Sequence, residues 1–185
     1  MDLNKAKSIL GAEFSFHADF VYQIVKELGL KKSVKILDIG TGFGNMAIIL
    51  ALQGYKVITG EPEGHNWSNW EESAKKLSLE EQITFKFFRA EKLPFEDGTF
   101  DAVFCLTSLH HIDNKNQAMR EFLRVTSEQG LIVIFELNDE GVRVLRERMP
   151  SHPKAINPED YSKNLPLSLN FKEGKFVDGY IFRKL

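Results

Sequence analysis

The feature that most constrains this chain is the segment of residues 35–44, whose sequence is KILDIGTGFG. It combines an apolar run, one acid and a glycine at every second position. Because glycine lacks a Cβ atom, such a loop can adopt turns that other residues avoid and can bring its backbone close to a ligand. Residues 45–52 continue as an apolar helix-like run, and the first amides of a helix favour polar or anionic groups. The segment therefore predicts a strand, a loop and a helix that bind a nucleotide-like cofactor.

Strand-like runs alternate with helix-like runs along the rest of the chain. Strands are predicted at residues 34–39, 55–59, 83–87, 101–106 and 131–137, and a hairpin at residues 167–171 and 176–182. The first five strands are counted as five βα units. This order predicts an α/β fold, namely a Rossmann-like, doubly wound, mostly parallel seven-stranded sheet with a C-terminal antiparallel hairpin and helices on both faces.

The length of 185 residues fits a single domain over residues 1–185. We predict three parts: an N-terminal helical cap at 1–33, a cofactor-binding core at 34–137, and a helix, loop and hairpin at 138–185. Within the core, Trp67 and Trp70 lie at helical spacing and are interpreted as core anchors rather than as a cage for a substrate.

The composition excludes several function classes. Lys and Arg number 24 and Asp and Glu number 26, so the net charge is −2, and we predict no nucleic-acid partner. A lone cysteine, Cys105, excludes an internal disulfide framework and a cysteine metal cluster, and no metal site is predicted. The first ten residues lack the apolar core of a signal peptide, and no apolar run approaches the roughly 20 residues of a membrane span. A soluble cytoplasmic protein is predicted.

Polar residues follow the carboxyl ends of the predicted strands, where doubly wound sheets bind their ligands. Glu61 follows the second strand and is placed to accept hydrogen bonds from both hydroxyls of a ribose. Arg89 and Glu91 follow the third strand, and His110 and His111 follow the fourth. We expect these groups to converge with the glycine loop on one edge of the sheet.

The glycine loop by itself does not identify the cofactor. Its pattern is GxGxG, whereas the dinucleotide fingerprint is GxGxxG, and Asn45 stands at the position of the third glycine. The loop is thus a poor match to an NAD-binding turn. Asp38 lies within an apolar strand, where a carboxylate is costly to bury without partners. We expect those partners to be amides of the glycine loop or the ammonium group of a ligand.

In combination, four motifs resemble the class I S-adenosylmethionine-dependent methyltransferases, and within them the small-molecule branch of ubiquinone and menaquinone C-methyltransferases. The motifs are VKILDIGTGFG at 34–44, Glu61, AEKLPF at 90–95 with the pair at 100–101, and SLHHI at 108–112. The resemblance covers residues 34–137. It implies an enzyme that transfers a methyl group from S-adenosyl-L-methionine to a small-molecule acceptor by in-line displacement.

The resemblance also implies a role for each part of the predicted edge. The glycine loop would pass beneath the methionine and ribose, Asp38 would orient that loop, and Glu61 would bind the ribose hydroxyls. Arg89 departs from the family, which often has an acid there that accepts a hydrogen bond from the adenine amino group, because arginine only donates. The implied cofactor-binding residues are Asp38, Gly40, Thr41, Gly42, Gly44, Glu61, Pro62, Arg89, Ala90, Glu91 and Leu106.

No obligatory catalytic residue follows from these motifs, because a sulfonium already activates its methyl group and the protein has mainly to position the acceptor and exclude water. His110 and His111 are candidates for a general base, with a structural role as the alternative. The acceptor pocket is expected from segments outside the resemblance: Phe14, Phe16, His17, Tyr22 and residues 151–166.

Two further hypotheses remain open beside the active enzyme. The chain could bind the cofactor as a non-catalytic or partner-dependent subunit, in which case exposed aromatic residues near the N-terminus would form an interface. An NAD-dependent oxidoreductase is the other alternative. For the enzyme itself, the expected partner is a small-molecule acceptor, and the chain is expected to be a monomer or homodimer that a partner protein could join.

Overall fold

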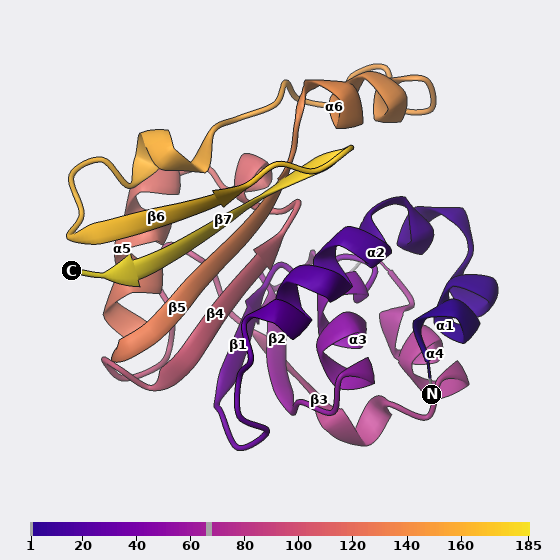
Figure 1. Cartoon of the computed structure of the whole chain (residues 1–185), viewed down its shortest axis with the longest axis horizontal. Coiled ribbons are helices and arrows are strands. Elements are labelled where there is room, and N and C mark those ends of the chain that lie inside the picture. The colour runs from indigo at the N-terminus through magenta and orange to yellow at the C-terminus, as the bar shows by residue number, and fades with distance from the viewer. Residues whose placement is uncertain (1, 66–67) are drawn as a thin grey trace.

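The computed structural model describes residues 2–65 and 68–185, so the predicted role of Trp67 lies outside the described residues. All seven strands of the described chain join one sheet in the order β3-β2-β1-β4-β5-β7-β6 (Figure 1). Their bounds are β1 Ile36–Ile39, β2 Val57–Glu61, β3 Ile83–Phe87, β4 Phe100–Leu106, β5 Thr126–Leu137, β6 Leu167–Lys172 and β7 Val177–Lys184. Strands β1 to β5 are parallel to one another, and β7 is antiparallel to both β5 and β6. The predicted fold class is confirmed.

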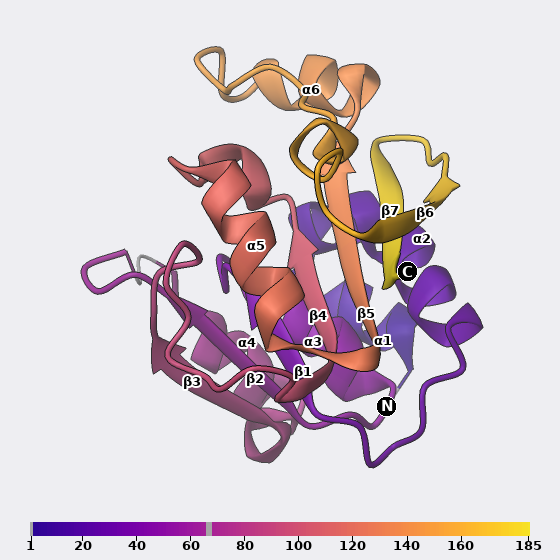
Figure 2. The same ribbon diagram turned by 90° about the vertical axis from the view of Figure 1, so that its left-hand side faces the viewer.

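Helices cover both faces of the sheet. The helices are α1 Leu3–Leu10, α2 Ala12–Glu27, α3 Asn45–Leu52, α4 Trp70–Lys76, α5 Lys115–Val125 and α6 Asp139–Arg146, with short 3-10 turns at η1 Glu80–Gln82, η2 Leu109–His111 and η3 Pro158–Tyr161. Figure 2 shows α5 in front of the sheet and α1 to α4 behind it. Within the described chain, no helix is long and apolar enough to cross a membrane.

The two faces follow from the alternation of side chains along each strand. Ile36 and Phe104 pack into the cluster under α2, α3 and α4, whereas Leu37 and Val103 pack into the cluster under α5. Residues 131–137 of β5 are buried on both sides, as their continuous apolar run predicts. The strand nevertheless begins at Thr126, five residues before that run.

One element of the predicted topology is wrong. The sequence counts five βα units, but residues 88–99 between β3 and β4 contain no helix. The strand β3 lies at the edge of the sheet, and its side chains pass from a buried Ile83 to a Phe87 that is 55% exposed. The loop itself takes the place of a helix, because its residues Phe88, Ala90 and Leu93 are buried in the cluster under α5.

The strand register places the predicted site residues on one edge of the sheet. Ile39 pairs with Gly60 on one side and with Cys105 on the other, so Gly40, Glu61 and Leu106 follow at the same level. Between β1 and β4 the order of the strands reverses, because β2 lies on one side of β1 and β4 on the other. Ligands of doubly wound sheets bind at such a switch point.

Candidate functional site

The glycine loop after β1 requires glycine for two different reasons. Gly40 has φ +81°, and a Cβ atom there would lie 2.3 Å from the Oγ atom of Ser108, so both conformation and space exclude a side chain. Gly42 has φ +50°, but no described atom lies within 4 Å of the position of its Cβ. Open space therefore adjoins the middle of the loop, and a ligand can approach the backbone at that point.

Glu61 at the end of β2 holds the glycine loop in place. Its Oε1 atom accepts a hydrogen bond from the Gly42 amide at 2.6 Å, and the amides of Gly40 and Thr41 donate to the Gly60 carbonyl at 3.1 and 3.3 Å. Partial burial raises the pKa of Glu61, and the Gly42 amide opposes that rise. The Oε2 atom has no hydrogen-bond partner in the described chain, so Glu61 retains acceptor capacity for a ligand.

Asp38 is fully buried, and its partner differs from the expected one. It accepts a hydrogen bond from the Thr59 hydroxyl at 2.8 Å rather than from the loop amides. Thr59 in turn lies 2.9 Å from the hydroxyl of Thr41, which must donate because Thr59 has already given its proton to Asp38. Asp38 is therefore linked to the glycine loop through two hydroxyl groups.

Burial also changes the ionisation of Asp38. Desolvation raises its pKa to about 8, with a further contribution from the charge of Glu61, while the bond from Thr59 opposes the rise. Its Oδ1 atom is buried without a hydrogen-bond partner among the residues described. At neutral pH Asp38 is therefore mainly a protonated, uncharged group beneath the loop.

The loop after β3 carries the residues predicted to lie beside the adenine. Ala90 is buried in the cluster under α5, whereas the side chain of Arg89 is 59% exposed and lies 3.8 Å from Glu91 and 3.7 Å from Asp113. The carbonyl of Pro62 accepts a bond from the His65 amide. Arg89 is thus directed toward two acids on the surface, which agrees with its inability to replace a hydrogen-bond acceptor.

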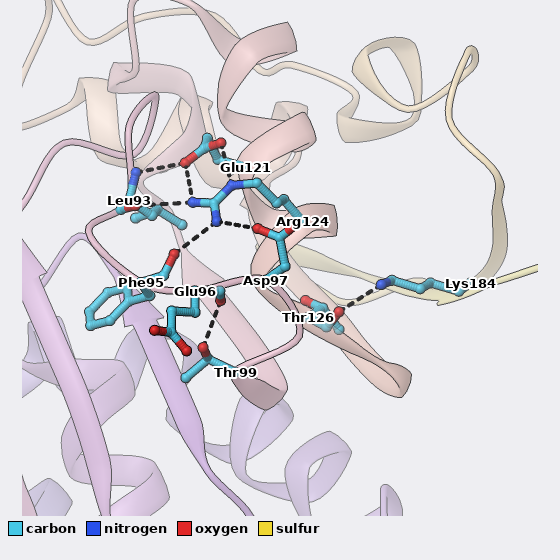
Figure 3. Close-up of polar contacts among 9 residues, drawn as sticks. All are labelled: Leu93, Phe95, Glu96, Asp97, Thr99, Glu121, Arg124, Thr126 and Lys184. Carbon is cyan, nitrogen blue, oxygen red and sulfur yellow. Dashed lines mark hydrogen bonds and ion pairs between the residues drawn. The ribbon is translucent and has the colours of Figure 1, made fainter.

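Arg124 on α5 fixes the same loop from below, and no sequence pattern indicated this role. Its guanidinium donates to the carbonyls of Leu93 and Phe95 and to the carboxylates of Asp97 and Glu121, at distances between 2.7 and 3.0 Å (Figure 3). Glu121 also accepts a bond from the Leu93 amide. A planar guanidinium can make several such bonds at once, so one side chain positions the whole segment that follows Ala90.

The end of β4 is joined directly to the glycine loop. The Ser108 hydroxyl lies 3.0 Å from the Leu106 carbonyl and 3.4 Å from the Gly40 carbonyl. Thr107 adopts a positive φ of +46°, and its amide donates to the Phe135 carbonyl at 2.7 Å. Leu106 therefore lies next to the loop, as the sequence predicts for a residue on the methionine side of the site.

The two candidate base histidines belong to a larger cluster. His110 is buried, and its Nδ1 atom lies 2.7 Å from Glu136 at the end of β5. His152, which lies beyond α6, brings its ring to within 4.9 Å of the His110 ring and 5.8 Å of the His111 ring, measured between centroids. The side chain of His111 is exposed at the surface, but partial desolvation of its ring and the neighbouring histidines lower its pKa to about 4. Sequence reasoning missed both Glu136 and His152, because neither lies within a motif.

The residues expected to form the acceptor pocket divide into two groups. Phe14 and His17 are buried in the packing of α2, Phe16 stacks on Phe176 at 4.4 Å between centroids, and Tyr22 is half-buried. These residues therefore expose little aromatic surface near the N-terminus. Residues 151–166 instead pack through Ile156 and other apolar side chains on the cluster under α5. That segment carries His152 to the end of β4.

With this geometry established, we compared the chain with known proteins. The model of the family described as "Methyltransferase domain" matches residues 37–134, which is more than half of the chain. The chain belongs to the methyltransferase domain family. The predicted resemblance to the class I S-adenosylmethionine-dependent methyltransferases is thereby confirmed, and the methyltransferase domain spans the glycine loop, Glu61 and the histidine turn.

Individual relatives agree with this family. The methyltransferase domain is 31% identical to norajmaline N-methyltransferase of Rauvolfia serpentina over 80% of this chain and 50% of that protein. It is 28% identical to demethylmenaquinone methyltransferase of Staphylococcus aureus over 78% of this chain and 60% of that protein. The chain thus spans about half the length of the curated relatives it matches.

A solved structure supports the fold. A SAM dependent methyltransferase from Aquifex aeolicus superposes with a TM-score of 0.70 at 21% identity, covering 98% of each chain. At this identity the likeness concerns the arrangement of the helices and strands. It is consistent with one continuous fold from α1 to β7 in this methyltransferase domain.

Proposed function

We propose that this chain is an S-adenosyl-L-methionine-dependent methyltransferase acting on a small-molecule acceptor, and that residues 1–185 form one such domain. The observation that carries the proposal is the bond between Glu61 and the Gly42 amide at the strand-order reversal, in a member of the methyltransferase domain family. It combines a glycine loop open to a ligand with an acid that has a second oxygen to offer. A ribose with two adjacent hydroxyls fits that pair of features.

The residues present fit the cofactor in three places. The open space at Gly42 admits the methionine and ribose portions. Glu61 can accept from ribose hydroxyls through Oε2 while Oε1 keeps its bond to the loop. Pro62 is half-buried on the same edge, whereas Ala90 and Leu106 are buried, so these two would meet adenine and the methionine chain through their backbone. Thr41 and Asp38 support the loop from beneath without contacting the cofactor.

In this proposal the chain contributes positioning rather than covalent chemistry. S-adenosylmethionine supplies a methyl group that its positively charged sulfur already activates. Gly40 and Gly42 orient the cofactor, and residues 151–166 exclude water from the end of β4 and hold the acceptor in line. His111 is poorly suited as a general base, since a pKa of about 4 gives it little affinity for the acceptor's proton at neutral pH.

Two alternatives carry less support. The NAD-dependent oxidoreductase would need a glycine where Asn45 begins α3, and the family match favours methyl transfer. A non-catalytic or partner-dependent subunit could use exposed aromatic residues near the N-terminus as an interface, but Phe14 is buried and Phe16 stacks on Phe176. The cytoplasmic location and the monomeric or homodimeric state remain predictions from the sequence. The sequence leaves the identity of the acceptor atom open.

Isothermal titration with S-adenosylmethionine and adenosylhomocysteine tests the cofactor, and NADH serves as the competing ligand. Glu61→Gln removes a charged acceptor, so we expect the free energy of cofactor binding to weaken by roughly 1.5 to 3 kcal/mol. Glu63→Gln is the matched control, because Glu63 is an exposed acid two residues away. Binding of NADH but not S-adenosylmethionine, or equal affinities of both variants, would contradict the proposal.

A further inference from the structure

The histidine cluster at the end of β4 has a property that packing alone does not explain. One ring nitrogen of each of His110, His111 and His152 lies within 4.8 Å of the corresponding nitrogens of the other two. The three residues come from two segments of the chain separated by some forty positions, and the fold brings them together over the end of one strand. Such convergence of imidazole nitrogens is typical of metal sites.

The ring of His110 is oriented by a buried carboxylate. Glu136 is 1% exposed and His110 is 3% exposed at the side chain, and Nδ1 lies 2.7 Å from a Glu136 oxygen. A carboxylate oxygen accepts a hydrogen bond from a ring N–H, so this contact directs Nδ1 to Glu136 and leaves Nε2 as the ring nitrogen that can meet an ion. That Nε2 atom is buried and has no hydrogen-bond partner among the described residues. A buried ring nitrogen without a partner costs free energy unless another group satisfies it.

His152 is arranged in the same way. Its Nδ1 atom lies 3.0 Å from the carbonyl of Pro153, which can only accept, so Nδ1 donates there and Nε2 is the ring nitrogen left to meet an ion. Metal-bound histidines almost always donate the other ring N–H to a carboxylate or a backbone carbonyl. His110 and His152 show one example of each arrangement.

From this geometry we infer that His110, His111 and His152 bind a divalent transition-metal ion of the zinc type, with Glu136 as the positioning residue for His110. Three imidazoles with one further position for water form a common zinc site. Tetrahedral bonds of about 2.0–2.1 Å place ligand nitrogens about 3.3 Å apart, so the rings would have to approach by up to about 1.5 Å. The exposed His111 and the loop that carries His152 can make this adjustment.

The inference does not rest on the proposed methyltransferase activity. The cluster nevertheless adjoins the proposed cofactor site, because the His111 amide donates to the Ser108 carbonyl and the Ser108 hydroxyl reaches Gly40. It also revises the sequence-based expectation of no metal site. That expectation considered cysteine clusters, whereas the ligands here are histidines from two segments that are distant in sequence.

The test is a zinc titration of the untagged full chain, from which bound metal and the stripping agent have been removed. A chromophoric chelator competes with the chain for zinc and reports the affinity of the chain. We expect one zinc per chain. Glu136→Gln removes a supporting residue, and such a loss typically weakens metal binding by about 10–100-fold. His111→Ala removes an exposed ligand, so it should weaken zinc binding by more than about 100-fold. His65→Ala is the matched control, because it removes an exposed histidine outside the cluster.

Equal zinc affinity in the wild type and His111→Ala, or equal weakening by His65→Ala, would overturn the site. Unchanged affinity in Glu136→Gln would overturn the role of Glu136. Circular dichroism of each variant verifies that the chain has folded. The shift of Tm by S-adenosylmethionine is measured on the same samples, so a failure of the proposed cofactor is distinguishable from a failure of the metal site.

Discussion

Asp38 makes the stability of this protein depend on pH in a direction opposite to that of most carboxylates. Its pKa is about 8 in the folded chain against 3.8 for the ordinary group. Between these two values the folded state holds a proton that the unfolded state has released. The free energy of unfolding therefore falls as pH rises, by up to 1.36 kcal/mol per pH unit. Over the whole interval the loss is about 6 kcal/mol.

Asp38→Asn isolates this contribution, because asparagine resembles the protonated side chain and does not titrate. The difference in free energy of unfolding, wild type minus variant, should be largest near pH 4, fall by about 3 kcal/mol between pH 5 and pH 7, and level off above pH 8. A constant offset of about 1–3 kcal/mol is added if the new amide is left unsatisfied.

The assay is urea denaturation followed by tryptophan fluorescence at a series of pH values, with both proteins in the same buffers. Other titrating groups are common to both proteins and cancel in the difference. Asp113→Asn is the control, since that carboxylate is 90% exposed. A difference between wild type and Asp38→Asn that does not change between pH 5 and pH 8 would refute the protonated, buried Asp38.

Two further predictions concern the segments around the site. Arg124→Lys leaves several loop acceptors without a donor and should lower the free energy of unfolding by about 1–3 kcal/mol, whereas Arg120→Lys on the exposed side of α5 should change it by less than about 0.5 kcal/mol in the same denaturation assay. Gly40→Ala places a Cβ atom against Ser108 and should lower Tm by at least several degrees more than Gly42→Ala, which meets no atom within 4 Å. Equal Tm values for the two alanine variants would show that the close approach of Gly40 to Ser108 does not affect stability. Equal effects of the two lysine variants would show the same for the contacts of Arg124.

Local sequence was sufficient to predict much of the architecture. The helix α3 has the predicted bounds 45–52, because Gly44 and Gly54 adopt the positive φ values that begin and end it. The hairpin of β6 and β7 was likewise predicted from two apolar runs around a turn. By contrast, the first residues of β5 are polar and partly exposed, so no apolar run indicated them. Thr126 joins the sheet by pairing with Phe100 of β4, and the register shifts before the next pair, Ala102 with Leu131.

The partner of Asp38 illustrates a limit of the sequence. The motif indicated that a buried carboxylate needed partners, and the nearest candidates were the amides that follow it. The strand register instead places Thr59 of β2 directly beside Asp38. A register is set by pairing between strands that are distant in the chain, so the choice between a loop amide and a hydroxyl could not be made from the motif.

By itself, the sequence determined the strand, loop and helix around Gly40 and Gly42, the mostly parallel sheet and the family resemblance, because these depend on periodicity and on the conformational freedom of glycine. Only the tertiary structure decided which side chains meet. It linked Asp38 to Thr41 through Thr59, placed Arg124 under the loop after β3, and brought His152 to His110 and Glu136. Such contacts depend on how the layers pack, and no local pattern encodes them.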